Sequence, residues 1–159
     1  LFEAMHTGHS VYSTVHADSS AETIRRLVNP PIEISPNLLS AVNLNVVMFR
    51  DRRKGIRRVF QISEFVDAEG EILSVKPNIL YRWRPDIDDV IIHNTPLKLF
   101  EDLSFLTGMT LQEIKKDLYE KKRILDWMAK NNIRTVNEVG NIIRDYYLSP
   151  EELLKRIKR

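Results

Sequence analysis

A change of hydrophobic pattern near His93 constrains the fold more than any other feature of this sequence. Upstream of Pro85, three runs have the alternation of β-strands, over residues 43–50, 56–67 and 71–83. Downstream, helix-capping signals recur together with apolar residues at helical spacing. A chain of this kind is neither all-α nor all-β. The pattern predicts an α/β part over residues 1–92, followed by a small helical subdomain over residues 93–159.

The three strand-like runs predict an antiparallel meander at the edge of a sheet. Residues 51–55 join the first two runs, and Gly55 suits a hairpin turn. Residues 67–70 form the next turn and end in Gly70.

The helical subdomain is predicted from its start and stop signals. Thr95 and Pro96 begin a first helix, and Gly108 ends it. Three capping boxes, in which a Thr or Ser side chain and a Glu side chain bond each other's backbone amides, then begin three more helices. They are the pairs Thr110 and Glu113, Thr135 and Glu138, and Ser149 and Glu152.

The first 42 residues are predicted to form short helices and one short strand around a polar segment. Leu1 to Met5 has the character of a helix interior that ends at Gly8, without an initiator Met before it, and we expect an upstream part of the protein to precede it. Residues 11–15 read as a short buried strand. A helix over residues 20–28, capped by Ser19 with Glu22, ends at Asn29-Pro30-Pro31, and Ser35-Pro36 opens another short helix.

The composition excludes membrane-spanning proteins and proteins that depend on cysteine chemistry. The chain has 159 residues, of which 43% are hydrophobic and 29% are charged, with a net charge of +2. No run approaches the roughly 18 apolar residues of a membrane span, so membrane contact is expected to be peripheral at most. The sequence contains no Cys, which excludes disulfides, thiolate metal sites and a Cys nucleophile, and fits a cytoplasmic protein.

The densest chemical signal is the run Thr7-Gly8-His9-Ser10-Val11-Tyr12-Ser13-Thr14-Val15-His16-Ala17-Asp18. Three interpretations compete. The histidines at 6, 9 and 16 could bind a metal, but they lack the helical i, i+4 spacing of a zinc protease and a nearby acidic ligand. They could instead satisfy backbone groups at strand ends. The third interpretation is a polar ligand site at a strand end, which is where α/β proteins bind ligands.

The same run resembles the His box of the GspE and PilB type of secretion ATPase, at Thr7, Gly8, His9, Thr14 and His16. Residues 17–19 and 25–27 are similar to the archaeal branch of that family, and residues 57–65 resemble the end of its RecA-like core. The absence of Cys, and hence of a tetracysteine zinc insertion, is also similar to the archaeal branch.

The resemblance implies an α/β fold that is the C-terminal part of a RecA-like P-loop ATPase core. It implies ATP and Mg²⁺ as cofactors, a homo-hexamer, an inner-membrane platform protein as partner, and a cytoplasmic position at the membrane. His16 would position the terminal phosphate, with His9 and Thr14 beside it and Thr7 and Gly8 at the nucleotide. No G-x-x-x-x-G-K-[ST] motif occurs, so we expect this chain alone to bind no cofactor and to be inactive.

A second cluster is basic and surrounds the predicted hairpin, with only Asp51 opposing it. Charges of this kind protect sheet edges from pairing, but they also suit a subunit interface or an acidic membrane or protein surface. Nucleic acid is disfavoured, because no stacking aromatics are interleaved with the cations. The cluster comprises Arg50, Arg52, Arg53, Lys54, Arg57 and Arg58.

Two other functions stay open from the sequence. The chain could be a non-enzymatic module whose helical part docks a partner. It could also belong to a hexameric motor that translocates nucleic acid, which salt-dependent binding of single-stranded DNA would reveal.

Overall fold

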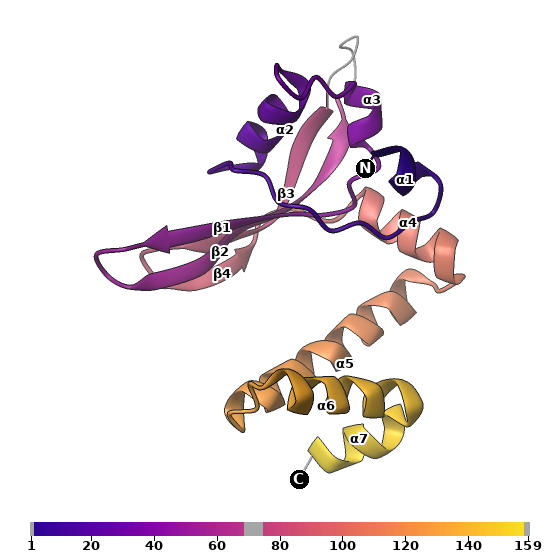
Figure 1. The fold of residues 1–159 in the computed structure, drawn as a ribbon. Helices are drawn as coiled ribbons and strands as arrows, with labels where there is room; N and C mark the ends of the chain where they lie inside the picture. Colours follow the sequence, from indigo (N-terminus) through magenta and orange to yellow (C-terminus); the bar gives the residue numbers. More distant parts are fainter. Residues whose placement is uncertain (1, 69–74, 158–159) are drawn as a thin grey trace. The chain divides into compact units, whose positions relative to one another are not determined.

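The computed structural model describes residues 2–68 and 75–157 and has the mixed α/β fold that the sequence predicts. The chain divides into two compact units, Leu1–Asp102 and Leu103–Arg159, which are considered separately below. The sequence pattern changes near His93, upstream of this division. Figure 1 shows the sheet within the first unit and the helices α5 to α7 within the second.

The first unit is built on a four-stranded antiparallel sheet with the strand order β1-β2-β3-β4. The predicted antiparallel meander is therefore confirmed, and β2 has the predicted bounds. Among the described residues the meander is the whole sheet and not the edge of a larger one. Gly55, at φ +66, occupies the left-handed region in the β1–β2 turn. Residues 71–74 of the third predicted run lie outside the described residues. The strands are β1 (Asn45–Asp51), β2 (Ile56–Asp67), β3 (Val75–Arg84) and β4 (Asp89–Ile92).

The expectation that strands end at Pro85 is wrong, because β4 follows. This strand has four residues, too few for an alternation that sequence alone could identify. Its pairing decides its conformation, since Val90 lies opposite Trp83 and Ile92 lies opposite Tyr81 in the β3–β4 ladder. The N–H of His93 then donates to the carbonyl of Leu80 at 2.8 Å.

Three helices supply the core of the first unit. They are α1 (Phe2–His6), α2 (Ser20–Val28) and α3 (Pro36–Leu39). The predicted helix and its stop at Asn29 are confirmed for α2. The buried cluster joins these helices to the sheet and consists of Phe2, Ile24, Leu27, Leu39 and Phe65.

Helix α4 (Lys98–Thr107) begins later than predicted, at Lys98 rather than next to Thr95 and Pro96. The cause is the fully buried carboxylate of Glu64 on β2. It accepts the backbone N–H groups of Leu97 at 2.7 Å and Leu99 at 2.8 Å, which have no intrahelical partner at a helix start. The Asn78 side chain donates to the same carboxylate at 2.7 Å. The predicted stop at Gly108 is confirmed by its φ of +70 and its N–H bond to Ser104.

The second unit consists of helices around a small apolar core. The predicted capping boxes at Thr110 and Thr135 are both confirmed. A helix begins after Ser149 as predicted, but the described hydrogen bonds include none between Ser149 and Glu152. Ser149 instead ends the preceding helix, and its N–H donates to the Asp145 carbonyl at 2.8 Å. The complete helices are α5 (Leu111–Lys130), α6 (Val136–Leu148) and α7 (Pro150–Ile157), and their buried core residues are Ile124, Met128, Ile142 and Leu153.

The helices were also compared with the dimensions of a membrane. Within the described residues, none combines the length and the apolar character that crossing a bilayer requires.

Candidate functional site

The segment that carries the His-box residues begins at a well-formed helix end. After α1, the N–H of Gly8 donates to Met5 at 3.2 Å and the N–H of His9 donates to Ala4 at 3.0 Å. This pair of bonds is a Schellman motif, and Gly8 has the left-handed conformation that the motif requires, at φ +83. The predicted helix end at Gly8 is therefore confirmed. It fixes the direction in which the chain leaves α1.

Thr7 orients the imidazole of His9. The Thr7 Oγ1 lies 3.0 Å from the carbonyl oxygen of Ala4, to which its single hydroxyl proton can donate, and 3.2 Å from His9 Nδ1. With that proton used, Oγ1 can only accept from His9. The arrangement favours the Nδ1–H tautomer of neutral His9 and leaves Nε2 as a hydrogen-bond acceptor.

The predicted buried strand over residues 11–15 is wrong. Residues 9–17 have neither strand nor helix conformation, and Thr14 and His16 are exposed, as is the side chain of Tyr12 at 99%. The β-branched residues Val11 and Val15 favour extended backbone, but a strand also needs a ladder partner, and none of the described strands pairs with this segment. The segment is instead an extended, exposed connection between α1 and α2 (Figure 1).

The downstream end of the segment is tied to the sheet by a buried polar network at the start of α2. Both the N–H and the hydroxyl of Ser20 donate to Gln61 Oε1, at 3.1 and 3.2 Å, and the Ser63 hydroxyl donates to Ser20 Oγ at 2.8 Å. All three residues are buried. Because these bonds cross between the α2 start and β2, residues 17–20 have a fixed place on the sheet.

A local cap adds to this anchor. Ser19 Oγ accepts the N–H of Glu22 at 3.1 Å, which confirms half of the predicted capping box. The Glu22 carboxylate accepts the N–H of Asp18 at 2.8 Å rather than that of Ser19. This backbone bond, together with Arg26, holds the pKa of Glu22 below its ordinary value.

The structure thus brings together only some of the residues predicted for the site. Thr7, Gly8 and His9 form one compact group at the end of α1, whereas Thr14 and His16 lie further along the exposed segment. In the described part of the chain, no three His, Cys, Asp or Glu residues are placed to hold a metal ion.

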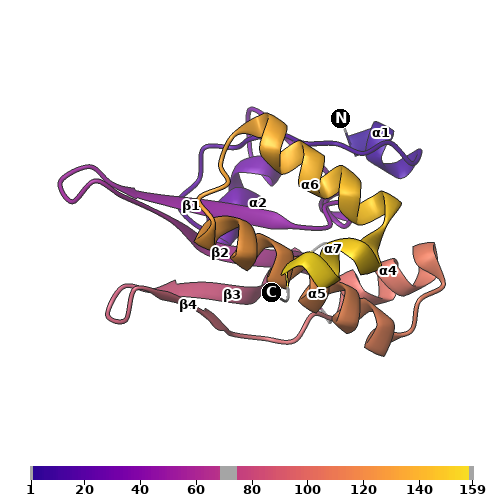
Figure 2. The same ribbon diagram turned by 90° about the horizontal axis from the view of Figure 1, so that it is seen from below.

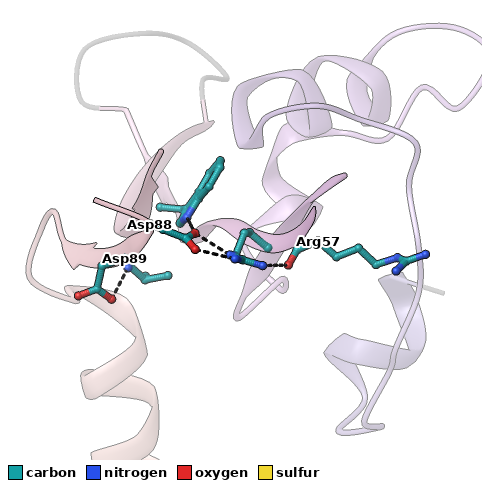
Figure 3. A network of polar contacts seen from close by, with 6 residues as sticks. Arg57, Asp88 and Asp89 are labelled. Carbon is teal, nitrogen blue, oxygen red and sulfur yellow. Dashed lines mark hydrogen bonds and ion pairs between the residues drawn. The ribbon is translucent and has the colours of Figure 1, made fainter. Parts of the chain in front are cut away.

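A second polar group lies at the end of the sheet that carries the β1–β2 and β3–β4 turns. The sequence analysis did not predict its acidic residue, Asp88. Asp88, on the β3–β4 turn, accepts from Arg58 Nε at 2.7 Å and Nη2 at 2.6 Å, and from Trp83 Nε1 at 2.9 Å (Figure 3). Arg58, and then Trp83, lower the pKa of Asp88 to about 2. The predicted basic cluster therefore has one cation fewer available to a ligand, since Arg58 is neutralised within the fold.

Comparison with known proteins finds a family match for the N-terminal part of the chain. Residues 1–60, which include the whole exposed segment with α2 and α3, match the model of a described family. The match is to type II/IV secretion system proteins. It supports the general family that the His-box run of residues 7–18 resembles. The matched region ends within β2.

Three relatives from Methanocaldococcus jannaschii extend the similarity along the chain. The uncharacterized protein MJ0781 is 33% identical over 147 residues, which cover 91% of this chain and 20% of that protein. The uncharacterized protein MJ0900 is 32% identical over 153 residues, with 92% and 27% covered. The uncharacterized protein MJ1287 is 30% identical over 132 residues, with 82% and 48% covered. The chain spans from about a fifth to about half of the length of these relatives.

Proposed function

We propose that this chain supplies the C-terminal part of a RecA-like motor domain in a hexameric secretion-type ATPase of the archaeal branch. The family match over residues 1–60 and the similarity to three archaeal proteins support this proposal. In the longer protein, ATP hydrolysis with Mg²⁺ would drive movement of subunits that extrudes pilin-like or secreted proteins. Its partners would be further copies of itself and a platform protein at the cytoplasmic membrane.

The observation that carries the proposal is an exposed polar segment with two fixed ends. Residues 9–17 have no secondary structure of their own, but the Schellman motif fixes their start and the Ser20 network fixes their end. Functional residues commonly lie on loops that a rigid scaffold positions in this way. The exposed histidines His9 and His16 are on this segment and can contact a ligand without any rearrangement of the core.

Each predicted site residue has a definite role in the proposal. His16 would donate a hydrogen bond to the terminal phosphate or accept one from the attacking water, with Thr14 as a neighbouring hydroxyl. His9, held by Thr7, would present Nε2 as an acceptor. The loop that binds the phosphates would come from another part of the longer protein, since the sequence has no phosphate-binding motif.

Chemical protection tests this placement. In the longer protein, diethyl pyrocarbonate should modify His16 rapidly without nucleotide and slowly with a non-hydrolysable ATP analogue and Mg²⁺, as measured by peptide mass spectrometry. His93 is also exposed and lies outside the segment, so its modification should not change and serves as the internal control. Equal modification of His16 with and without nucleotide would contradict the proposal.

The helical unit favours a second function, the docking of a partner protein. Phe105, Val136 and Leu148 are large apolar side chains that are 89%, 88% and 74% exposed. Apolar side chains gathered in one exposed patch mark protein interfaces, so this function requires these side chains to share one face. If docking is the whole function, the longer protein should bind its partner equally well with and without ATP. It should also hydrolyse no ATP.

A further inference from the structure

The end of the sheet that projects beyond α1 to α3 carries a concentration of unpaired positive charge. The β1–β2 turn and the β3–β4 turn lie at this same end (Figures 1 and 2). Residues 50–58 contain six Arg and Lys and one Asp, a net charge of +5 in a chain whose total is +2. The rest of the chain is therefore net negative, and the positive charge is localised at the hairpin.

Most of these cations have no partner in the described structure. Arg58 is neutralised by Asp88. No described residue forms an ion pair with the other five cations, which are Arg50 and Arg57 on the strands and Arg52, Arg53 and Lys54 in the turn. Asp51 does not neutralise the turn, because its Oδ1 accepts the backbone N–H groups of Arg53 and Lys54. In Figure 3 the side chain of Arg57 extends away from the Asp88 network. The free cations are Arg50, Arg52, Arg53, Lys54 and Arg57, and all five are exposed.

The register of the hairpin makes this arrangement costly for folding. Arg50 lies directly opposite Arg57 in the β1–β2 ladder. Like charges at directly opposite positions of an antiparallel pair are destabilising. A bound anion would remove that repulsion, and guanidinium groups bind phosphate oxygens in a fixed, bidentate geometry.

Aliphatic side chains are exposed at and beside the same end of the sheet. Met48 on β1 is 64% exposed, and Ile87 on the β3–β4 turn is 57% exposed. The ring of Phe49 is not available for stacking on bases, because it packs against Phe60 and Trp83, with ring centroids 6.3 and 5.1 Å apart. Exposed aliphatic groups beside cations suit the boundary between lipid headgroups and acyl chains, whereas single-stranded nucleic acid binding relies on stacking aromatics.

We propose that this hairpin surface, consisting of Arg50, Arg52, Arg53, Lys54 and Arg57 with Met48 and Ile87, binds the phosphate headgroups of anionic lipids at a membrane surface. The hairpin tip is a projecting turn, and mobile headgroups can rearrange around a projecting turn more readily than a rigid partner can. Each Lys or Arg near an anionic surface contributes enough to change binding about fivefold. The proposal is independent of the ATPase assignment and concerns a different part of the first unit.

Vesicle co-sedimentation of the 159-residue chain tests this inference. The chain should bind vesicles of phosphatidylcholine that contain phosphatidylglycerol, and it should not bind vesicles of phosphatidylcholine alone. Replacing the turn cations together, as Arg52→Gln, Arg53→Gln and Lys54→Gln, should weaken binding about 100-fold at physiological ionic strength. The side chains of these residues form no described bond, so the circular dichroism melt should be preserved.

A charge-matched control separates the hairpin surface from net charge. Arg25→Gln, Arg26→Gln and Lys76→Gln remove the same charge from exposed positions of the first unit, on α2 and at the end of β2 and β3 away from the β1–β2 turn (Figure 1). They should leave binding within about twofold, since surface attraction decays within a Debye length. Equal losses in both triple variants would overturn the proposal, and so would absence of binding to the anionic vesicles. Tighter binding to a single-stranded oligonucleotide, lost in the turn variant, would also overturn it in favour of nucleic acid.

Arg57→Gln gives a readout that a structural role would not give. Removing one of the opposed charges should raise the denaturation midpoint of the free chain, while binding to anionic vesicles falls about fivefold. A lower midpoint would show that Arg57 supports the fold instead, and the proposal would then be wrong for this residue pair.

Discussion

At the scale of single residues, Asp88 shows how a polar contact can decide the conformation of a turn. It has a positive φ of 47°, which is uncommon for a residue other than Gly, and it accepts from both Arg58 and Trp83. These bonds connect the β3–β4 turn to β2 across the projecting end of the sheet. The sequence could not predict them, because Arg58 and Asp88 lie 30 positions apart.

The pKa of Asp88 gives the first prediction. NMR titration of its carboxyl group should give a midpoint of about 2 in the folded chain, compared with the ordinary value of 3.8. Because the folded pKa is the lower one, the Arg58 pair stabilises the fold above pH 3.8, and this contribution is lost as the pH falls toward 2. In Arg58→Gln the midpoint should rise toward 3.8. A midpoint that does not change in this variant would contradict the assigned cause.

Glu64 gives the second prediction, since its buried carboxylate accepts from two backbone groups at the start of α4 and from Asn78. In Glu64→Gln, one of the two acceptors becomes a donor that faces another donor. The unfolding free energy should fall by about 1–3 kcal/mol, measured by urea denaturation. Glu101→Gln, at an exposed position of the same helix, is the control and should change it by less than about 0.5 kcal/mol. A small effect at Glu64 would show that the start of α4 does not depend on this carboxylate.

At the scale of secondary-structure elements, the correct predictions are those with a local cause. Gly55 and Gly108 occupy left-handed conformations that their positions in a turn and at a helix end predicted. Thr110 and Thr135 form capping boxes within four residues of sequence. Such signals depend only on neighbouring residues, so one sequence is enough to identify them.

The wrong predictions required knowledge of distant partners. Residues 11–15 have strand-like composition, but no described strand pairs with them, so they stay exposed. β4 has too few residues for a pattern and is placed by its register with Trp83. The start of α4 depends on Glu64, more than 30 residues upstream. For the candidate site, the sequence identified the residues of the segment but not the Ser20, Gln61 and Ser63 network that anchors it.

The local signals in the helical unit lead to the third prediction. Residues 103–159 contain their own buried cluster, formed by Ile124, Met128, Ile142 and Leu153, and two complete capping boxes. This fragment, produced alone, should keep its helicity and melt cooperatively when followed by circular dichroism at 222 nm. A broad, non-cooperative melt would show that its helices require the first unit. Thr135→Ala in the same fragment should lower the unfolding free energy by about 1 kcal/mol.

At the scale of the whole molecule, we expect the two units to have different functions. The first unit holds an exposed histidine segment between two anchors, and at the projecting end of its sheet it holds unpaired cations. All the buried polar side chains of the described residues belong to the first unit, so the described part of the second unit has no buried polar network. We therefore expect nucleotide-linked effects from substitutions in residues 7–18 and effects on partner binding from substitutions in the helices.

In the proposed function His16 acts on a nucleotide held by the longer protein. Steady-state ATP turnover of that protein with His16→Ala tests this role most directly. Turnover should fall about 10²–10⁴-fold while nucleotide affinity changes little, because positioning or acid–base roles have this magnitude and affinity resides in the phosphate-binding loop. Lys54→Ala on the hairpin is the control and should leave both quantities near normal. A His16→Ala protein that melts normally and turns over ATP at the wild-type rate would contradict the claim.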